Sequence, residues 1–322
     1  DTHARATPMA DAPLSIKAIM DEYHRAIYGD AEERAAARRE RERAARERER
    51  DDNRWRTRRS GGDGLFDVVF ENPLHGRFKD LPSVARMLRE RPDRVKRVET
   101  SYCHFDGFEY NKPTVFITTL TDLALPPPCP RNPCAAVRAG ELHGAQVGEC
   151  DAATKNSIPA GITDAIVDAW LAKHTETGAT AFVFVDAFAG FGSVHARVRA
   201  RHPSVSVYAN DIVDREQEGD FDLSADSGFT LGSLLAMALG KRFPASIDAI
   251  AAHPGGPVGW AKAKKIAVLF HVSTPCETYS TQALGVHRVA GSATPTSAAA
   301  RKADDMNDAL VAWVERTVLV AP

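Results

Sequence analysis

The stretch FVFVDAFAGFGS, residues 182–193, decides the fold. Its first four residues are apolar and form a buried-strand pattern that leads into Asp186 and then into a turn containing Gly190 and Gly192. A helical pattern follows over residues 195–201. Glycines at such a turn let backbone N–H groups approach a ligand where a Cβ would obstruct it. The stretch therefore predicts a strand–turn–helix unit of an α/β sheet, with a ligand at the turn.

An acidic residue ends the next predicted strand. Asp211 follows the strand over residues 205–209 and lies twenty-one positions after Gly190, about the distance at which nucleotide-binding folds place a carboxylate on ribose hydroxyls. His195 occupies the third glycine position of the dinucleotide fingerprint G-x-G-x-x-G. The pattern therefore favours a nucleoside ligand without a pyrophosphate, such as S-adenosylmethionine. The alternative is a tight turn with a purely structural role.

Further strands and helices are predicted on both sides of this unit. Apolar or β-branched runs predict strands over residues 66–70, 95–101, 115–119 and 266–272, and helical spacing predicts helices over residues 162–174, 231–242 and 298–316. Strands this apolar, alternating with helices, indicate a parallel sheet covered on both faces. We therefore expect a Rossmann-like α/β fold.

Two more strand ends carry reactive side chains. Glu71, Asn72 and Pro73 follow the first strand, and Pro275 and Cys276 follow the strand over residues 266–272. Taken alone, a cysteine is more often a small buried apolar residue, and a strand-end glutamate usually faces solvent. Both motifs, however, occupy the edge where α/β sheets bind ligands. A thiolate beside a methyl donor is an arrangement for nucleophilic catalysis.

Together the three motifs resemble those of the cytosine-C5 DNA methyltransferase family. ENPLHGRFKDLP (residues 71–82) and YCHFDGFEYNKPT (residues 102–114) resemble its phage-like branch, and the likeness covers about residues 65–320. The resemblance implies an S-adenosylmethionine-dependent enzyme that flips a cytosine out of DNA. It assigns the attack on C6 to Cys276, the contact with N3 to Glu71, and a positioning role to Lys112, which replaces the family's arginine.

The same resemblance implies the cofactor contacts. Asp211 would hold the ribose, Phe188 would pack against the cofactor, and Asp226 would reach the adenine amine. The full set expected to bind S-adenosylmethionine is Asp186, Phe188, Gly190, Gly192, Asp211, Asp226 and Pro275.

The order of the motifs is permuted. The family usually begins with the glycine turn, whereas here Glu71 precedes Cys276 by 205 residues. This order is similar to that of plant domain-rearranged methyltransferases and fits a circular permutation. A fragment of a tandem array would give the same order.

Composition divides the chain into an extension and a domain. The expected parts are an Arg/Glu-rich helix or linker (1–60) and the permuted methyltransferase domain (61–322). We expect three parts within the domain: a half with the Glu-Asn motif (61–120), a small irregular recognition lobe (121–157), and a half with the cofactor turn and the Pro-Cys motif (158–322). Residues 31–60 hold twelve arginines against eight acidic residues. This segment is typical of a solvated linker, and the alternatives are a phosphate-binding arm or a surface for a protein partner.

The small lobe carries four possible metal ligands within 22 residues: Cys129, Cys134, His143 and Cys150. A structural Zn²⁺ would stabilise a segment with so little apolar content. Incidental cysteines in a proline-rich loop are the alternative.

Whole-chain composition excludes several classes of protein. The 322 residues have a net charge of -2 and are 43% hydrophobic, which is ordinary for a globular protein, and the five cysteines are an odd number. We find neither a membrane-length apolar run nor a signal-peptide pattern. We therefore expect an intracellular protein with DNA as its partner and no membrane contact, nuclear if the source is eukaryotic and otherwise cytoplasmic. A catalytically inactive methyltransferase-like DNA-binding or regulatory protein and an RNA cytosine-5 methyltransferase stay open as alternatives.

Overall fold

The computed structural model describes most of the chain after residue 63. Described are residues 64–105, 111–130, 157–190, 192–211, 219, 222–223, 230–274, 279, 286–289 and 292–319. The chain divides after Ser60 into residues 1–60 with Pro322 and residues 61–321. All described residues belong to the second unit.

A six-stranded mixed sheet forms the centre of this unit. In chain order its strands are β1 (Phe66–Pro73), β2 (Lys96–Ser101), β3 (Pro113–Thr118), β4 (Ala181–Asp186), β5 (Ser206–Ala209) and β6 (Ile266–Val272), and in space they run β2-β3-β1-β6-β4-β5. β3 is antiparallel to β1 and β2, while β1, β6, β4 and β5 are mutually parallel. The α/β prediction is confirmed, but the expectation of an all-parallel sheet is wrong at β3. The reason is that the eleven residues between β2 and β3 are fewer than a parallel crossover needs.

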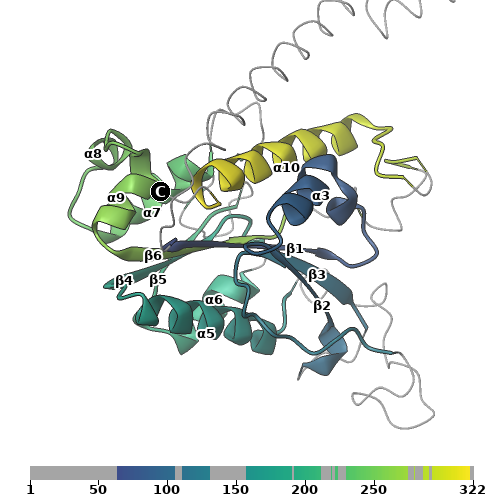
Figure 1. Ribbon diagram of the computed structural model, residues 1–322, viewed down its shortest axis with the longest axis horizontal. Coiled ribbons are helices and arrows are strands. Elements are labelled where there is room, and N and C mark those ends of the chain that lie inside the picture. Colours follow the sequence, from purple (N-terminus) through teal and green to yellow (C-terminus); the bar gives the residue numbers. More distant parts are fainter. Residues whose placement is uncertain are drawn as a thin grey trace, which may run out of the picture. The chain divides into compact units, whose positions relative to one another are not determined.

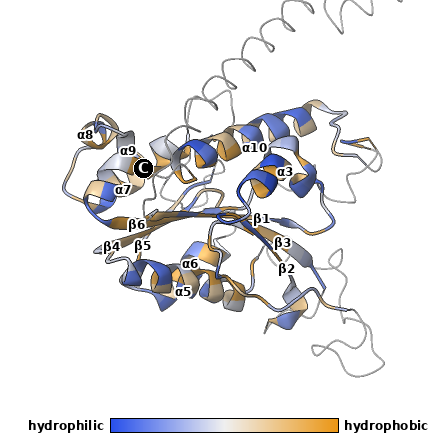
Figure 2. Cartoon of the chain, in the orientation of Figure 1, coloured by the Kyte–Doolittle hydropathy of each residue, from blue (hydrophilic) through white to orange (hydrophobic). Residues whose placement is uncertain are grey.

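Helices cover both faces of the sheet (Figure 1). The helices are α3 (Pro82–Glu90), α5 (Ala160–Glu176), α6 (Ser193–Arg201), α7 (Leu231–Arg242), α8 (Ile247–Ala251), α9 (Gly256–Ala263) and α10 (Ala298–Thr317), with short 3-10 turns η1 (Phe78–Asp80) and η2 (Tyr102–His104). α5 and α6 lie on one face, and the other helices lie on the opposite face. Figure 2 shows the strands mainly in the hydrophobic colours and polar stretches along the outer sides of the helices.

The central strands are buried because both of their faces are covered. Every residue of β6 is buried, and so is every residue of β1 except Pro73. Helices α7 and α10 begin at hydroxyl caps, since the side chains of Thr230 and Ser297 accept hydrogen bonds from backbone N–H groups of the first turn. Among the described helices, none has both the length and the apolar character needed to cross a bilayer.

A buried polar cluster fastens α5 to β1. Asp67 has no exposed surface and accepts hydrogen bonds from Lys173 Nζ (2.8 Å), His174 Nε2 (2.5 Å) and Thr119 Oγ1 (2.7 Å). Burial alone would raise the pKa of Asp67, but the hydrogen bond from His174 and the charge of Lys173 outweigh it and lower the pKa. Asp67 is therefore held as a carboxylate inside the domain.

Candidate functional site

The predicted catalytic and cofactor-binding residues that the structure describes lie at one edge of the sheet. Because β1, β6, β4 and β5 are parallel neighbours, their carboxyl ends lie side by side. Asp186 and Asp211 lie at the end of β4 and just beyond the end of β5, and Glu71 lies within β1, one residue past the position that pairs with the end of β6. The edge therefore combines the candidate acid with the candidate cofactor turn. Asp226, Pro275 and Cys276 lie outside the described residues.

The glycine turn after β4 has the backbone conformation that its sequence predicts. Gly190 and Gly192 have φ angles of +52° and +82°, in the left-handed region that favours glycine. The backbone N–H of Gly190 donates to Asp211 Oδ2 at 2.7 Å, which ties the turn to the end of β5. Among the described residues, nothing lies within 4 Å of the position that a Cβ on Gly190 would take. The described part of the chain therefore leaves one side of the turn unfilled, and Phe188 beside it is half-buried against the core.

Asp186 supports this turn from inside the domain. Its side chain is 1% exposed, and its two oxygens lie 3.2 Å from His195 Nδ1 and 3.0 Å from His271 Nδ1. Burial would raise the pKa of Asp186, but the hydrogen bonds from the two histidines outweigh it and lower the pKa to about 2. His195, at the third fingerprint position, thus joins α6 to β4. Asp186 holds protein elements together, whereas the sequence predicted a direct cofactor contact.

Glu71 lies in a nearly closed polar site. It is 5% exposed, and it accepts hydrogen bonds from Tyr102 Oη at Oε1 (3.1 Å) and from Ser273 Oγ at Oε2 (2.6 Å). Lys112 Nζ lies 4.0 Å from Oε1 and 4.7 Å from the centre of the Tyr102 ring. The structure therefore brings Glu71 and Lys112 together, as predicted. Sequence reasoning missed Tyr102 and Ser273, although Ser273 directly follows a strand whose end was already a candidate.

The residues on either side of 275–278 are hydrogen-bonded to the end of β1 and to the loop that follows it. Before them, Thr274 Oγ1 accepts a hydrogen bond from Asn72 Nδ2 at 3.4 Å. After them, the carbonyl oxygen of Tyr279 accepts a hydrogen bond from the backbone N–H of Arg77 at 3.0 Å. A Cβ on Gly76 would lie only 3.0 Å from that carbonyl oxygen, so this close approach favours glycine. The segment that carries the Glu-Asn motif is therefore hydrogen-bonded to the residue before the Pro-Cys segment and to the residue after it.

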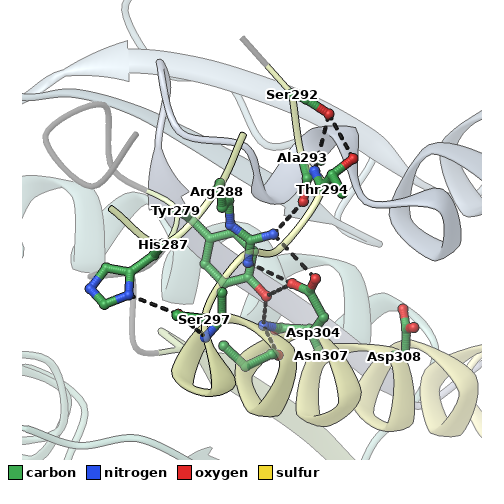
Figure 3. A network of polar contacts seen from close by, with 12 residues as sticks. Tyr279, His287, Arg288, Ser292, Ala293, Thr294, Ser297, Asp304, Asn307 and Asp308 are labelled. Atoms are coloured by element: carbon green, nitrogen blue, oxygen red, sulfur yellow. Dashed lines mark hydrogen bonds and ion pairs between the residues drawn. The ribbon is translucent and has the colours of Figure 1, made fainter. Parts of the chain in front are cut away.

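Helix α10 anchors Tyr279 from the other side (Figure 3). The fully buried Tyr279 donates to Asp304 Oδ1 at 2.8 Å and accepts a hydrogen bond from Asn307 Nδ2 at 2.9 Å. The Arg288 guanidinium lies 4.2 Å from the ring centre and makes two hydrogen bonds to Asp304, at 2.6 and 3.1 Å. Burial and the charge of Asp304 both raise the pKa of Tyr279, so its hydroxyl stays protonated. This network holds the chain directly after residues 275–278.

Of the four predicted metal ligands, the structure describes only Cys129. Its neighbours are Cys103 and His104, which the sequence analysis did not select. The ligand atoms of these three residues all lie within 4.8 Å of one another. Cys134, His143 and Cys150 lie outside the described residues.

Comparison of the chain with protein-family models, with curated proteins and with solved structures finds no match in any of the three.

Proposed function

We propose that this protein is an S-adenosylmethionine-dependent DNA (cytosine-5)-methyltransferase with a circularly permuted order of motifs. The observation that carries the proposal is the 2.6 Å hydrogen bond from Ser273 Oγ to Glu71 Oε2. Ser273 precedes Cys276 by three residues, although Glu71 is 205 residues away from Cys276 along the chain. The two groups that cytosine-C5 chemistry requires therefore belong to adjoining strand ends.

Covalent geometry keeps the candidate nucleophile near the candidate acid. Cys276 is two residues beyond Thr274, which is hydrogen-bonded to Asn72. Two residues of chain span about 7 Å at most. We infer that the thiol and the carboxyl group engage one pyrimidine ring, the thiol at C6 and the carboxyl at N3.

The chemistry follows from the low reactivity of the cytosine ring. Addition of the Cys276 thiolate to C6 forms a carbon–sulfur bond and moves electron density to C5. A hydrogen bond from the proton of the Glu71 carboxyl group to N3 would stabilise the negative charge that develops on the ring as the thiolate adds. S-adenosylmethionine supplies the electrophilic methyl group that C5 accepts. Loss of the C5 proton to a base then breaks the carbon–sulfur bond and restores the thiolate. The target base is unreachable inside a duplex, so it must be flipped out.

The neighbours of Glu71 suit this use. Tyr102 and Ser273 are neutral donors that orient the carboxyl group, and Lys112 forms a longer ion pair with it at 4.0 Å, beyond hydrogen-bond distance. A carboxyl group held by hydroxyls can redirect one oxygen to a substrate nitrogen without separating a tight ion pair. Glu71 is therefore suited to contact with a base.

The glycine turn fits S-adenosylmethionine. The ligand would lie on the side of Gly190 that the described residues leave unfilled, and Asp211, which accepts from the Gly190 N–H, would contact the ribose hydroxyls through its other oxygen. Asp186 would act indirectly, through the conformation of the turn that it supports.

The permutation receives support from Arg94. Its guanidinium donates to the carbonyl oxygens of Leu319 (3.0 Å) and Val318 (3.2 Å), after α10. A Cβ on Gly64, before β1, would lie 3.5 Å from the same guanidinium. The segment that enters β1 and the segment that leaves α10 are therefore neighbours, which is the geometry that a circular permutation needs.

A methyl-transfer assay tests the proposal. The full chain is incubated with radiolabelled S-adenosylmethionine and either duplex DNA or an RNA of the same sequence. We expect label in DNA and none after Cys276→Ser, with the binding of S-adenosylmethionine retained in the variant. Label found only in RNA would mean that RNA, and not DNA, is the substrate. No label in either nucleic acid, with the binding of S-adenosylmethionine intact, would show an inactive methyltransferase-like protein.

A further inference from the structure

Three side chains with metal-binding atoms lie together at η2, the turn that also carries Tyr102. Cys103 and His104 belong to η2, immediately after β2, and Cys129 follows β3 in the chain. The backbone N–H of Cys129 donates to Ser101 Oγ at 3.0 Å, which holds this residue beside η2 despite the 26 positions between Cys103 and Cys129. One hydrogen bond from the Cys129 backbone to the Ser101 side chain therefore joins the two segments of the cluster.

The environment of the three side chains is suited to a bound ion. Cys103 and Cys129 are 3% and 9% exposed and pack against each other. His104 Nε2 is buried and has no hydrogen-bond partner among the described residues. A buried nitrogen without a partner loses its hydrogen bond to water and gains nothing in return. A metal bond at Nε2 would compensate for that loss.

The donor set indicates the metal. Two thiolates and one imidazole are soft or borderline ligands that favour Zn²⁺ over Mg²⁺ or Ca²⁺. Around tetrahedral zinc, with bonds of about 2.0–2.3 Å, neighbouring ligand atoms lie roughly 3.4–3.8 Å apart. The observed limit of 4.8 Å is therefore within a small side-chain adjustment of zinc geometry.

We propose that Cys103, His104 and Cys129 bind a structural Zn²⁺. Binding converts both thiols to thiolates and releases their two protons to solvent, while neutral His104 coordinates through Nε2. A water molecule or one further ligand completes the tetrahedron.

The site also has a consequence for Glu71. Tyr102, which donates to Glu71 Oε1 at 3.1 Å, directly precedes Cys103 in η2. Zinc would therefore fix the turn that orients Glu71, and this consequence alone rests on the proposed function. The ion itself would cross-link η2 to the segment after β3.

Metal content tests the site without reference to methyl transfer. The full chain is saturated with Zn²⁺ under reducing conditions, desalted and measured by elemental mass spectrometry, alongside Cys103→Ser, His104→Ala and Cys129→Ser. Cys276→Ser is the matched control, because it removes a thiol outside the cluster. We expect one zinc per chain in the wild type and in the control. Each ligand variant should bind zinc at least about tenfold more weakly.

A second measurement uses only the wild-type chain, in case a variant fails to fold. Co²⁺ in place of Zn²⁺ should give thiolate-to-cobalt charge-transfer absorption, and Zn²⁺ should protect two cysteines from alkylation, identified as Cys103 and Cys129 by peptide mass spectrometry. A wild-type chain that takes up no zinc would overturn the proposal. So would zinc that leaves both cysteines open to alkylation, or folded ligand variants that bind zinc as tightly as the wild type.

Discussion

Asp67 and Glu71 lie four residues apart on the same face of β1, and their surroundings differ. Asp67 is locked to a lysine at 2.8 Å and a histidine at 2.5 Å, and its pKa is lowered. Glu71 accepts from two hydroxyls, and its neighbouring lysine stays 4.0 Å away. A carboxylate held at short distance by a lysine and a histidine stabilises the fold, whereas one held mainly by hydroxyl groups can exchange a partner with a ligand. The comparison separates a structural acid from a proposed catalytic one on a single strand.

Glu71→Gln should give the largest effect on activity. The amide keeps the shape of the side chain and can still accept a hydrogen bond, but it cannot supply a proton or a full negative charge. We expect methyl transfer to fall by about 10²–10⁴-fold, with the melting temperature nearly unchanged. Single-turnover transfer to DNA measures the first quantity, and thermal denaturation measures the second. A variant with wild-type turnover would remove Glu71 from the chemistry.

Asp67→Asn should show the opposite behaviour. Loss of the charge leaves Lys173 and the buried His174 without their carboxylate, which we expect to lower the free energy of unfolding by about 3 kcal/mol. Urea denaturation gives this value. Methyl transfer well below the melting temperature should stay at the wild-type rate. A loss of activity in fully folded protein would contradict the structural role of Asp67.

Acid should weaken the domain through Asp186. Its pKa is about 2 in the folded state against an ordinary value of 3.8, so the folded state binds the proton less readily than the unfolded chain. The resulting stability is present in full above about pH 5 and is lost as the pH falls from about 4 to 2, and it amounts to about 2 kcal/mol.

Urea denaturation across this pH range measures that loss. Asp186→Asn should be less stable at pH 7 and should lose less stability on acidification. If both proteins lose stability in parallel from pH 5 to pH 2, Asp186 is not responsible.

Tyr102→Phe should give the smallest effect. It removes one of the two hydroxyls that orient Glu71 and leaves the ring under Lys112, so we expect about a fivefold to tenfold loss of methyl transfer, as for one hydrogen bond. In a Glu71→Gln background the same substitution should reduce methyl transfer by a smaller factor, because the carboxyl group that Tyr102 orients is already absent. Equal losses in both backgrounds would mean that Tyr102 does not act through Glu71.

The sequence predicts the long elements better than the short ones. β6 and α7 have the predicted bounds, 266–272 and 231–242, because an unbroken apolar run and a full helical period mark them. Helices α3, α8 and α9 were not predicted. They are five to nine residues long, which is little chain in which to recognise helical periodicity, and unlike the equally short α6 they do not follow a predicted strand and glycine turn.

The sequence predicts the site residues that lie at strand ends, but it does not predict those that reach the site only through tertiary contacts. Glu71 and Asp211 directly follow predicted strands. Tyr102 and Ser273 reach Glu71 from 31 and 202 positions away, and only the pairing of β1 with β3 and β6 brings them there. Cys103 and His104 were missed for the same reason, because η2 and the segment of Cys129 meet only after β2 and β3 have paired.

Trapping on DNA that contains 5-fluorocytosine tests the central claim most directly. Fluorine at C5 cannot be removed by a base, so a thiolate that has added to C6 stays bound once the methyl group has arrived. We predict a covalent protein–DNA adduct that depends on S-adenosylmethionine, is absent in Cys276→Ser and forms much more slowly in Glu71→Gln. An adduct that persists in Cys276→Ser, or no adduct in a wild-type chain that binds both S-adenosylmethionine and DNA, would contradict the account.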